Sequence, residues 1–373
     1  MKNFILAPDS FKGTMSADTV SSIWSTAIRK HIPDAKLYEI PLSDGGEGMV
    51  DAFLRVCGGE KKFLRVTGPM GSPVKAAYGI LPDSTAVVEM AACAGLPLVQ
   101  GEKDPSIATT YGLGEMISQI ASDGISKVIL GIGGSATNDC GIGMAAALGY
   151  LFYDERGNKL EPLAKNMSKV TQISKPSILP NIDLTVACDV DNPLFGKNGA
   201  TYTFGPQKGV AGELLELLDA GLMNMARVIK KDLHADVADL PGAGAAGGLG
   251  AGVVAFLNGD LRPGIDLLLD ALQFDSLLKE ADIVFVGEGR MDWQSAHGKA
   301  PIGIARRAAQ KGVPCIALCG SIGKGIDAVY DEGISAVFAS AQGSSSLDEI
   351  IKTCEEDMRR LADSVVRVLC LDS

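Results

Sequence analysis

The chain has 373 residues, of which 46% are hydrophobic and 21% charged, and it carries a formal net charge of −11 at pH 7. This length predicts two domains of roughly 100–200 residues each, and the composition is typical of a compact α/β protein and excludes a disordered or fibrous chain. Because the surface is acidic on average, nucleic acid is not an expected partner, and any anionic substrate needs a local positive pocket.

Short β-rich runs alternate with helical patterns at both ends of the chain. At the N-terminal end the predicted elements are a strand at 4–7, a helix that starts near Ser16 and ends before Pro33, and a strand at 36–40. At the C-terminal end they are strands at 283–286, 315–318 and 336–339 and a last helix at 345–368. This alternation is the signature of parallel βαβ units, so the five strands predict one doubly wound sheet.

The middle of the chain has a different pattern. Its predicted elements are antiparallel strands at 75–81 and 85–90, a helix at 110–122, a strand at 127–132, a Gly-rich turn and helix ending at 149, and a strand at 184–188. We therefore expect residues 1–66 and 281–373 to form one doubly wound α/β domain. Residues 67–280 are expected to form an inserted, mixed α/β domain.

Three features of the sequence indicate where in the cell the protein is expected. The uncharged stretch 240–259 is as long as a membrane span, but Gly and Ala dominate it, so it predicts a Gly-rich loop that enters a buried helix, and no membrane partner. The apolar run at the N-terminus is too short for a signal peptide. The eight cysteines form no CxxC pair and lie mostly in apolar runs, as buried thiols do in a reducing compartment. A cytoplasmic protein without a zinc site is expected.

In an open parallel sheet, ligands bind beyond the carboxyl ends of the strands, where loops and helix N-termini converge. In the sheet predicted from the two ends of the chain, the strand ends are followed by acidic residues, by glycines, which allow unusual backbone angles, and by one or two cations. The loops are Asp9–Gly13, Ser43–Gly48, Gly287–Ser295 with the following His297–Lys299, and Gly320–Ser321.

The middle segment adds two candidate loops. Gly133–Asn138 follows a strand and precedes a helix, so its backbone N–H groups are candidates to cradle phosphates. Asp189, Asp191 and Asn192 leave another strand end and are candidates to bind metal or to orient a hydroxyl, although an Asx turn before Pro193 explains them as well.

This mixture of acids, cations and glycines favours phosphoryl transfer, although each loop taken alone is also ordinary turn or cap chemistry. Two nucleotide-binding motifs are weak or missing. Gly242–Gly247 matches GxGxxG, but residues 237–241 before it make a poor strand, and no GxxxxGK[ST] sequence or protein-kinase signature occurs. A kinase built on this chain therefore needs another kind of nucleotide site.

Seven strings in order along the chain resemble the type I glycerate kinase family of bacteria: APDSFKGTMSA, PLSDGGEG, VTGPMGSPV, GIGGSATND, ACDVDNPL, GAGAAGGLG and GEGRMDWQSAHGKAPIGIA. The resemblance implies two interlocked domains, one flavodoxin-like and one restriction-endonuclease-like, with the active site between them. It also implies D-glycerate and ATP as substrates, Mg²⁺ as cofactor, and 2-phosphoglycerate or 3-phosphoglycerate as product. Ser295 stands where the family often has Thr, which keeps the hydroxyl.

Roles for single residues follow as hypotheses. Asp44 and Asp189 are the candidates to accept or orient the hydroxyl proton, with Lys12 as a charge for phosphate or carboxylate. Arg290 is suited to bidentate contact, and Asp292 and Glu288 to holding Mg²⁺ through water. The other candidates for substrate or nucleotide binding are Asp9, Ser10, Gly45, Gly46, Gly133, Gly134, Ser135, Thr137, Asn138, Asp191, Asn192, Gln294, Ser295 and Lys299.

Two other classes of protein fit the same sheet. A nicotinamide or flavin oxidoreductase requires a glycine fingerprint directly after a strand, which this chain lacks. A non-catalytic sugar-acid binding protein would keep the cleft without turning over ATP. The sequence leaves open which hydroxyl is phosphorylated, which domain binds ATP, and whether the chain forms a homo-oligomer.

Overall fold

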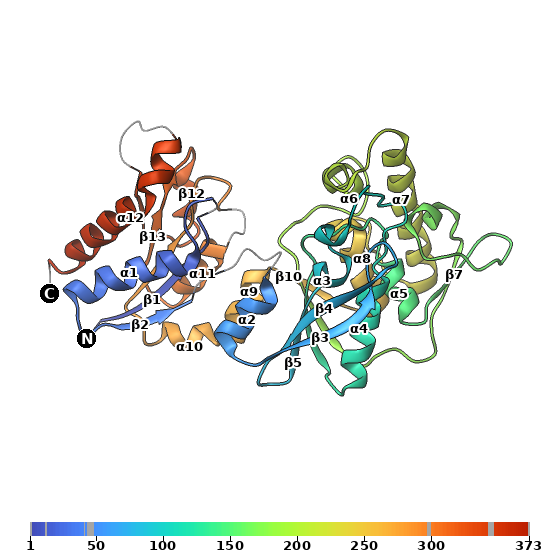
Figure 1. The fold of residues 1–373 in the computed structure, drawn as a ribbon, viewed down its shortest axis with the longest axis horizontal. Helices are drawn as coiled ribbons and strands as arrows, with labels where there is room; N and C mark the ends of the chain where they lie inside the picture. Colours follow the sequence, from blue (N-terminus) through green and yellow to red (C-terminus); the bar gives the residue numbers. More distant parts are fainter. Residues whose placement is uncertain are drawn as a thin grey trace. The chain divides into compact units, whose positions relative to one another are not determined.

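The structure is a computed structural model, and it describes residues 2–11, 13–40, 42, 48–296, 300–341 and 347–371 (Figure 1). The chain divides into two compact units. One consists of Met1–Asp44 and Ile265–Ser373, and the other of Gly45–Gly264. Each unit has its own sheet and its own buried core, as expected when one domain is inserted into another.

The first unit contains a parallel sheet built from both ends of the chain. Across the sheet its strands are β15 (Ala336–Ala339), β13 (Cys315–Cys319), β11 (Ile283–Gly287), β1 (Asn3–Pro8) and β2 (Lys36–Glu39). In chain order this arrangement is 2-1-3-4-5, which is the flavodoxin-like order. The doubly wound sheet is confirmed, and each strand forms within one residue of its predicted bounds.

Helices α1 (Ala17–His31) and α12 (Leu347–Leu369) lie side by side on one face of this sheet (Figure 1). Trp24 of α1 packs edge-on against Phe285 of β11, with ring centroids 6.1 Å apart, and its Nε1–H donates to Met358 Sδ of α12 at 3.3 Å. Val284 and Val286 alternate with Phe285 along the strand, so they face the opposite side, where α11 (Ala300–Gln310) packs. Helices therefore cover both faces.

Helix α1 begins where the sequence predicts. The hydroxyl of Ser16 accepts the backbone N–H of Thr19 at 3.1 Å, which satisfies one of the donors left open at a helix start. The shorter elements of the unit are α10 (Phe274–Leu278), β12 (Arg290–Met291), β14 (Ser321–Ile322) and η4 (Ile326–Val329).

The second unit contains a mixed sheet. Across it lie β10 (Asp260–Arg262), β9 (Asp183–Ala187), β6 (Lys127–Gly131), β5 (Thr85–Glu89), β4 (Pro73–Ile80) and β3 (Glu60–Thr67). The strands from β10 to β5 are parallel, and β4 and β3 run antiparallel. The mixed α/β prediction for this part of the chain is confirmed.

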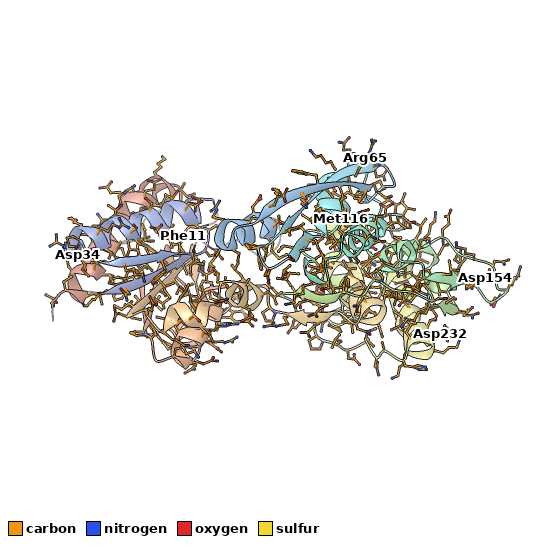
Figure 2. All side chains as sticks on the ribbon, turned by 90° about the horizontal axis from the view of Figure 1, so that it is seen from below. Phe11, Asp34, Arg65, Met116, Asp154 and Asp232 are labelled. Atoms are coloured by element: carbon orange, nitrogen blue, oxygen red, sulfur yellow. The ribbon has the colours of Figure 1, made fainter. Side chains whose placement is uncertain are left out.

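Helices and short elements surround this second sheet. They are α2 (Met49–Cys57), α3 (Ala91–Ala94), η1 (Leu96–Leu98), α4 (Tyr111–Ser122), α5 (Ile142–Ala147), β7 (Leu151–Tyr153), η2 (Ala164–Lys169), β8 (Gln172–Ser174), α6 (Ala200–Phe204), η3 (Pro206–Lys208), α7 (Glu213–Leu233) and α8 (Ala245–Leu257). Met116 of α4 belongs to the core of this unit, and Phe11 belongs to the core of the first unit (Figure 2).

The units divide at 44/45 and 264/265, whereas the sequence places the boundaries at 66/67 and 280/281. Residues 60–67 belong to the second unit because β3 pairs with β4 along its whole length. Residues after 264 belong to the first unit because α9 (Gly264–Ala271) and α10 are tied to α11. Arg307 of α11 donates to Asp270 Oδ1 at 2.5 Å and to Asp275 Oδ1 at 3.3 Å.

The uncharged stretch 240–259 becomes helix α8 and the turn before it, and nearly all of the helix is buried. This confirms the predicted Gly-rich loop that enters a buried helix. In the part of the chain that the structure describes, no helix has the length and apolar character needed to cross a membrane.

Candidate active site

The carboxyl ends of β1 and β11 lie next to each other in the first unit. The two strands pair in parallel up to Pro8 and Gly287, and the backbone N–H of Asp9 donates to the Gly287 carbonyl at 2.8 Å. Asp9 and Glu288, the first residues after the paired strands, therefore leave the sheet from the same edge. Between these strands the connections diverge to opposite sides of the sheet, and such a switch point is where ligands bind in doubly wound folds.

The loop after β1 is fixed by short-range hydrogen bonds. Ser10 N–H donates to Asp9 Oδ1 at 2.6 Å, and Phe11 pairs with Met15 through a single β-bridge. Phe11 is 1% exposed, so its ring anchors the loop in the core of the unit. The carboxylate of Asp9 is thereby held near the strand end.

The loop after β11 forms a small ribbon. Arg290 and Met291 of β12 pair in parallel with Ser321 and Ile322 of β14. Arg290 Nε lies 3.3 Å from Asp292 Oδ2, and the guanidinium is largely exposed. This ion pair holds a positive and a negative group close to the carboxyl end of the strand.

Asp292 and Ser295 close a tight turn after β12. The Oδ1 of Asp292 accepts Gln294 N–H at 3.0 Å, and the hydroxyl of Ser295 accepts Asp292 N–H at 3.1 Å. Ser295 is fully buried, so its hydroxyl shapes the turn that presents Asp292.

In the second unit, the Gly-rich turn (Gly133–Thr137) follows β6. Its backbone is tied on one side to residues 94–96: Leu96 N–H donates to the Gly134 carbonyl at 2.9 Å, and Ala136 N–H donates to the Ala94 carbonyl at 2.9 Å. Gly134 has a φ of +71°, a conformation that glycine adopts without the steric cost that a Cβ brings.

Lys208, which sequence reasoning missed, packs against the Gly-rich turn. Its Nζ donates to Ser135 Oγ at 2.6 Å and to the Thr137 carbonyl at 2.7 Å, and the residue is 2% exposed. Burial lowers the pKa of Lys208 to about 7, and the nearby carboxylate of Asp139 opposes that shift. Lys208 lies in the sequence GPQKG, which predicts a surface turn, so only the fold reveals this contact.

Asp139 lies just beyond the same turn and is fully buried. Its Oδ2 accepts Thr110 N–H at 2.9 Å and Thr110 Oγ1–H at 2.8 Å, and its Oδ1 accepts Gly141 N–H at 3.1 Å. Burial raises the pKa of Asp139, while the hydrogen bonds act in the opposite direction. This carboxylate joins the starts of α4 and α5, which flank the turn.

Two polar atoms of this region are buried without a hydrogen-bond partner, Thr137 Oγ1 and Asn138 Oδ1. Asn138 Nδ2 donates to Thr201 Oγ1 at 3.1 Å, so the side chain is half satisfied. Buried polar atoms usually have partners, so these two atoms are candidates to bind water or a ligand.

The loop after β9 carries Asp189, Asp191 and Asn192. Asp189 Oδ1 accepts Gly264 N–H at 2.8 Å at the start of α9, and a Cβ on Gly264 would lie 3.2 Å from Asp189 Oδ2. Asn192 Nδ2 donates to the Asn198 carbonyl at 2.8 Å and shapes its own loop, and Asp191 is exposed. The strands β9 and β6 are neighbours and parallel, so this loop and the Gly-rich turn leave the same edge of the sheet.

Sequence reasoning also missed Glu89, which ends β5 at this same edge. Its Oε1 accepts Val50 N–H at 2.7 Å and so caps the start of α2. Of the candidates named from the sequence, Lys12, Asp44, Gly45, Gly46 and Lys299 lie outside the described residues.

The described residues contain no group of three or more His, Cys, Asp and Glu side chains that could hold a metal ion. Magnesium often takes one or two carboxylates and completes its shell with water and substrate phosphates. The oxygen donors of Glu288 and Asp292 suit such a shared ion better than a protein cage.

The chain is similar to known kinases along its whole length. A glycerate kinase of Halalkalibacterium halodurans is 43% identical over 376 residues, which covers 99% of this chain and 98% of that protein. Glycerate 2-kinase of Escherichia coli is 41% identical over 372 residues, or 98% of each chain. A crystal structure assigned to glycerate kinase 2 of Salmonella typhimurium has a TM-score of 0.84 at 41% identity and covers 99% of this chain and 98% of that one.

These similarities leave the oxidoreductase and the non-catalytic binding protein without support. The GxGxxG match at Gly242–Gly247 follows no strand in the structure and instead leads into α8. The model of the glycerate kinase family matches residues 4–370. With relatives above 40% identity over nearly the full length of both chains, this protein is a kinase and belongs to the glycerate kinase family.

Proposed function

We propose that this enzyme transfers the γ-phosphoryl group of ATP to D-glycerate and releases 2-phosphoglycerate. The observation that carries the proposal is full-length similarity to enzymes named for glycerate, one of them a glycerate 2-kinase. Phosphoryl transfer needs positioning and charge neutralisation more than covalent chemistry, and acids, a guanidinium and a Gly-rich turn supply these at the strand ends.

The phosphate contacts are assigned to the Gly-rich turn. Its backbone carries glycines at 133 and 134, which let an oxyanion approach closely, and hydroxyls at Ser135 and Thr137. The unsatisfied Thr137 Oγ1 supports a ligand or water partner in this region. Arg290 is assigned to a carboxylate or phosphate group, because its fork of donors matches either anion.

The role of accepting the proton of the attacking hydroxyl is assigned to Asp189 or Asp44. Asp189 sits at the end of β9, and the hydrogen bond from Gly264 N–H orients its carboxylate. A carboxylate within hydrogen-bond reach of a hydroxyl can accept its proton as the phosphoryl group transfers. Asp44 belongs to the sequence SDGGEG, which has the same residue types as the loops after β1 and β11.

Glu288 and Asp292 are the residues that would hold Mg²⁺. Bound together with ATP, the ion would neutralise charge on the phosphate oxygens. The protein contributes oriented carboxylates: Asp292 is fixed by Arg290 and by the turn that Ser295 closes.

We assign the enzyme to the cytoplasm and its partners to small molecules. Four of the eight cysteines are buried, and burial raises the pKa of the Cys93 thiol to about 12. Thiols of this kind are unreactive core groups, as is usual in a reducing compartment.

The test is a reaction with ATP, Mg²⁺ and D-glycerate, followed by phosphorus NMR of the product. The expected signal is that of 2-phosphoglycerate together with ADP. A signal of 3-phosphoglycerate would leave the assignment as a glycerate kinase intact, but it would move the site of phosphorylation to the other hydroxyl. Absence of any phosphoglycerate, with ADP formed from another sugar acid, would overturn the substrate assignment.

A further inference from the structure

Lys208 is a buried ammonium whose two protein acceptors both belong to the Gly-rich turn. It is 2% exposed, and its Nζ donates to Ser135 Oγ at 2.6 Å and to the Thr137 carbonyl at 2.7 Å. Lysine is rarely buried to this degree, because removing its charge from water is costly. An apolar side chain of similar length would serve stability as well or better, so the contact calls for another explanation.

The two acceptors lie between β6 and α5, outside any helix or strand, and among the described residues backbone pairing holds this segment only through the single β-bridge between Ser135 and Gly95. In a planar trans peptide the carbonyl and the next N–H point in opposite directions. By holding the Thr137 carbonyl, Lys208 therefore also sets the direction of the Asn138 N–H. The Gly134 carbonyl is held in the same way by Leu96 N–H, at 2.9 Å.

Besides Lys208 and Leu96, the backbone around Gly247 also packs against the turn. A Cβ on Gly247 would lie 2.1 Å from the Thr137 carbonyl oxygen, and Cys140 N–H donates to the Gly247 carbonyl at 3.0 Å. The Thr137 carbonyl is thus confined between Lys208 and Gly247. A turn confined in this way is preorganised, which is the property that stabilises developing charge in phosphoryl transfer.

We propose that Lys208 is a positioning residue that holds the Gly-rich turn in the conformation that receives the phosphates of ATP. The proposal rests on the assignment of phosphate contacts to this turn. Charged groups near the lysine include Asp139 and Lys103. Asp139 faces it from the end of the turn, and Lys103 reaches the outer side of the Pro206–Lys208 segment, donating to the Gln207 carbonyl at 3.1 Å.

The experiment compares Lys208→Met with Lys103→Met. Both changes remove an ammonium at the Pro206–Lys208 segment: Lys208 is part of it, and Lys103 donates to its Gln207 carbonyl. Only Lys208 also contacts the Gly-rich turn. In Lys208→Met we expect kcat/KM for ATP to fall about 10²-fold, the usual effect of misplacing a positioning group, with KM for D-glycerate within about 3-fold of wild type. Lys103→Met is expected to match the wild type in both constants.

Thermal melts accompany the kinetics, and Lys208→Gln provides a second variant that keeps an N–H donor without the charge. It is expected to fall between wild type and Lys208→Met in kcat/KM for ATP. Wild-type kinetics in Lys208→Met would overturn the proposal, as would equal losses in the Lys103 variant. If neither Lys208 variant melts cooperatively, the lysine is a structural residue and the proposal is wrong. A wild-type enzyme without ATP turnover would instead contradict the proposed function.

Discussion

At the scale of single residues, three polar side chains of the second unit form hydrogen bonds with backbone groups from distant segments. Asp189 accepts Gly264 N–H, Glu89 accepts Val50 N–H, and Lys208 donates to the Thr137 carbonyl. Each bond fixes a side chain and also a loop. The same group can therefore act on substrate and on local structure, and a variant must separate the two effects.

Asp189→Asn makes that separation. Asn retains an Oδ1 that can accept Gly264 N–H, but it cannot take a proton from the substrate hydroxyl. We expect kcat to fall at least about 10³-fold, with the melting temperature within about 2 °C of wild type. Asp183→Asn, at the opposite end of β9, is the control and should leave kcat unchanged. Retained turnover in Asp189→Asn would transfer the role of base to Asp44.

The titration of Lys208 predicts a pH dependence of stability. Burial lowers its pKa from 10.5 to about 7, so above pH 7 the folded protein binds fewer protons at this site than the unfolded chain. The free energy of unfolding from this group therefore rises with pH between about 7 and 10.5. Between about pH 6.5 and 8.5, the free energy of unfolding measured in urea titrations should rise by about 2 kcal/mol more for the wild type than for Lys208→Met. Parallel pH profiles for the two proteins would contradict this.

At the scale of elements, the start of α8 is wound in an unusual way. Ala246, Gly247 and Gly248 have φ values of 53°, 69° and 89°, so three consecutive residues are left-handed. This run lets the backbone approach the end of the Gly-rich turn more closely than a side chain would allow. Ala246 bears the steric cost that its two glycine neighbours avoid.

Gly247→Ala should disturb both stability and the site. The added Cβ would meet the Thr137 carbonyl oxygen at 2.1 Å, in addition to the strain of a positive φ. We expect the free energy of unfolding to fall by about 3 kcal/mol or more, together with a lower kcat/KM for ATP. The matched control is Gly157→Ala, where φ is +78° and nothing lies within 4 Å, and it should cost only about 1 kcal/mol. Equal losses in the two variants would show that strain alone matters.

Local pattern was sufficient to predict these elements but not their partners. The short, continuous apolar runs of β1, β11 and β13 are typical of buried parallel strands, and Ser16 marks the start of α1. The expected boundary at 66/67 rests on a turn-rich sequence at 67–71. In the structure it is the turn of the β3–β4 hairpin.

At the scale of the whole molecule, a chain with net charge −11 has to bind two anionic substrates. Long-range attraction therefore gives no help, and binding depends on local cations and backbone N–H groups, to which the proposed Mg²⁺ would add by reducing the charge of ATP. In the proposed mechanism the ion arrives with the nucleotide, because Mg²⁺ is usually held by one or two carboxylates together with substrate phosphates.

Chelation of divalent metal tests this expectation. With EDTA in excess, turnover should be lost and then return on addition of Mg²⁺. The melting temperature of the protein without ATP should change by less than about 2 °C, because no structural ion is removed. A large fall in melting temperature on chelation would reveal a metal site that is part of the fold.

The fold class, the strands of the first sheet to within one residue, and the resemblance to glycerate kinases can all be read from the amino-acid sequence. These are properties of local periodicity and of strings that can be read along one line. The folded structure was needed to show that Lys208 contacts the Gly-rich turn, that Glu89 caps α2, and that β3 belongs to the second sheet. Each of these depends on residues far apart in the chain being buried together. Burial and hydrogen-bond partners are set by packing in three dimensions, so no single segment of the sequence contains them.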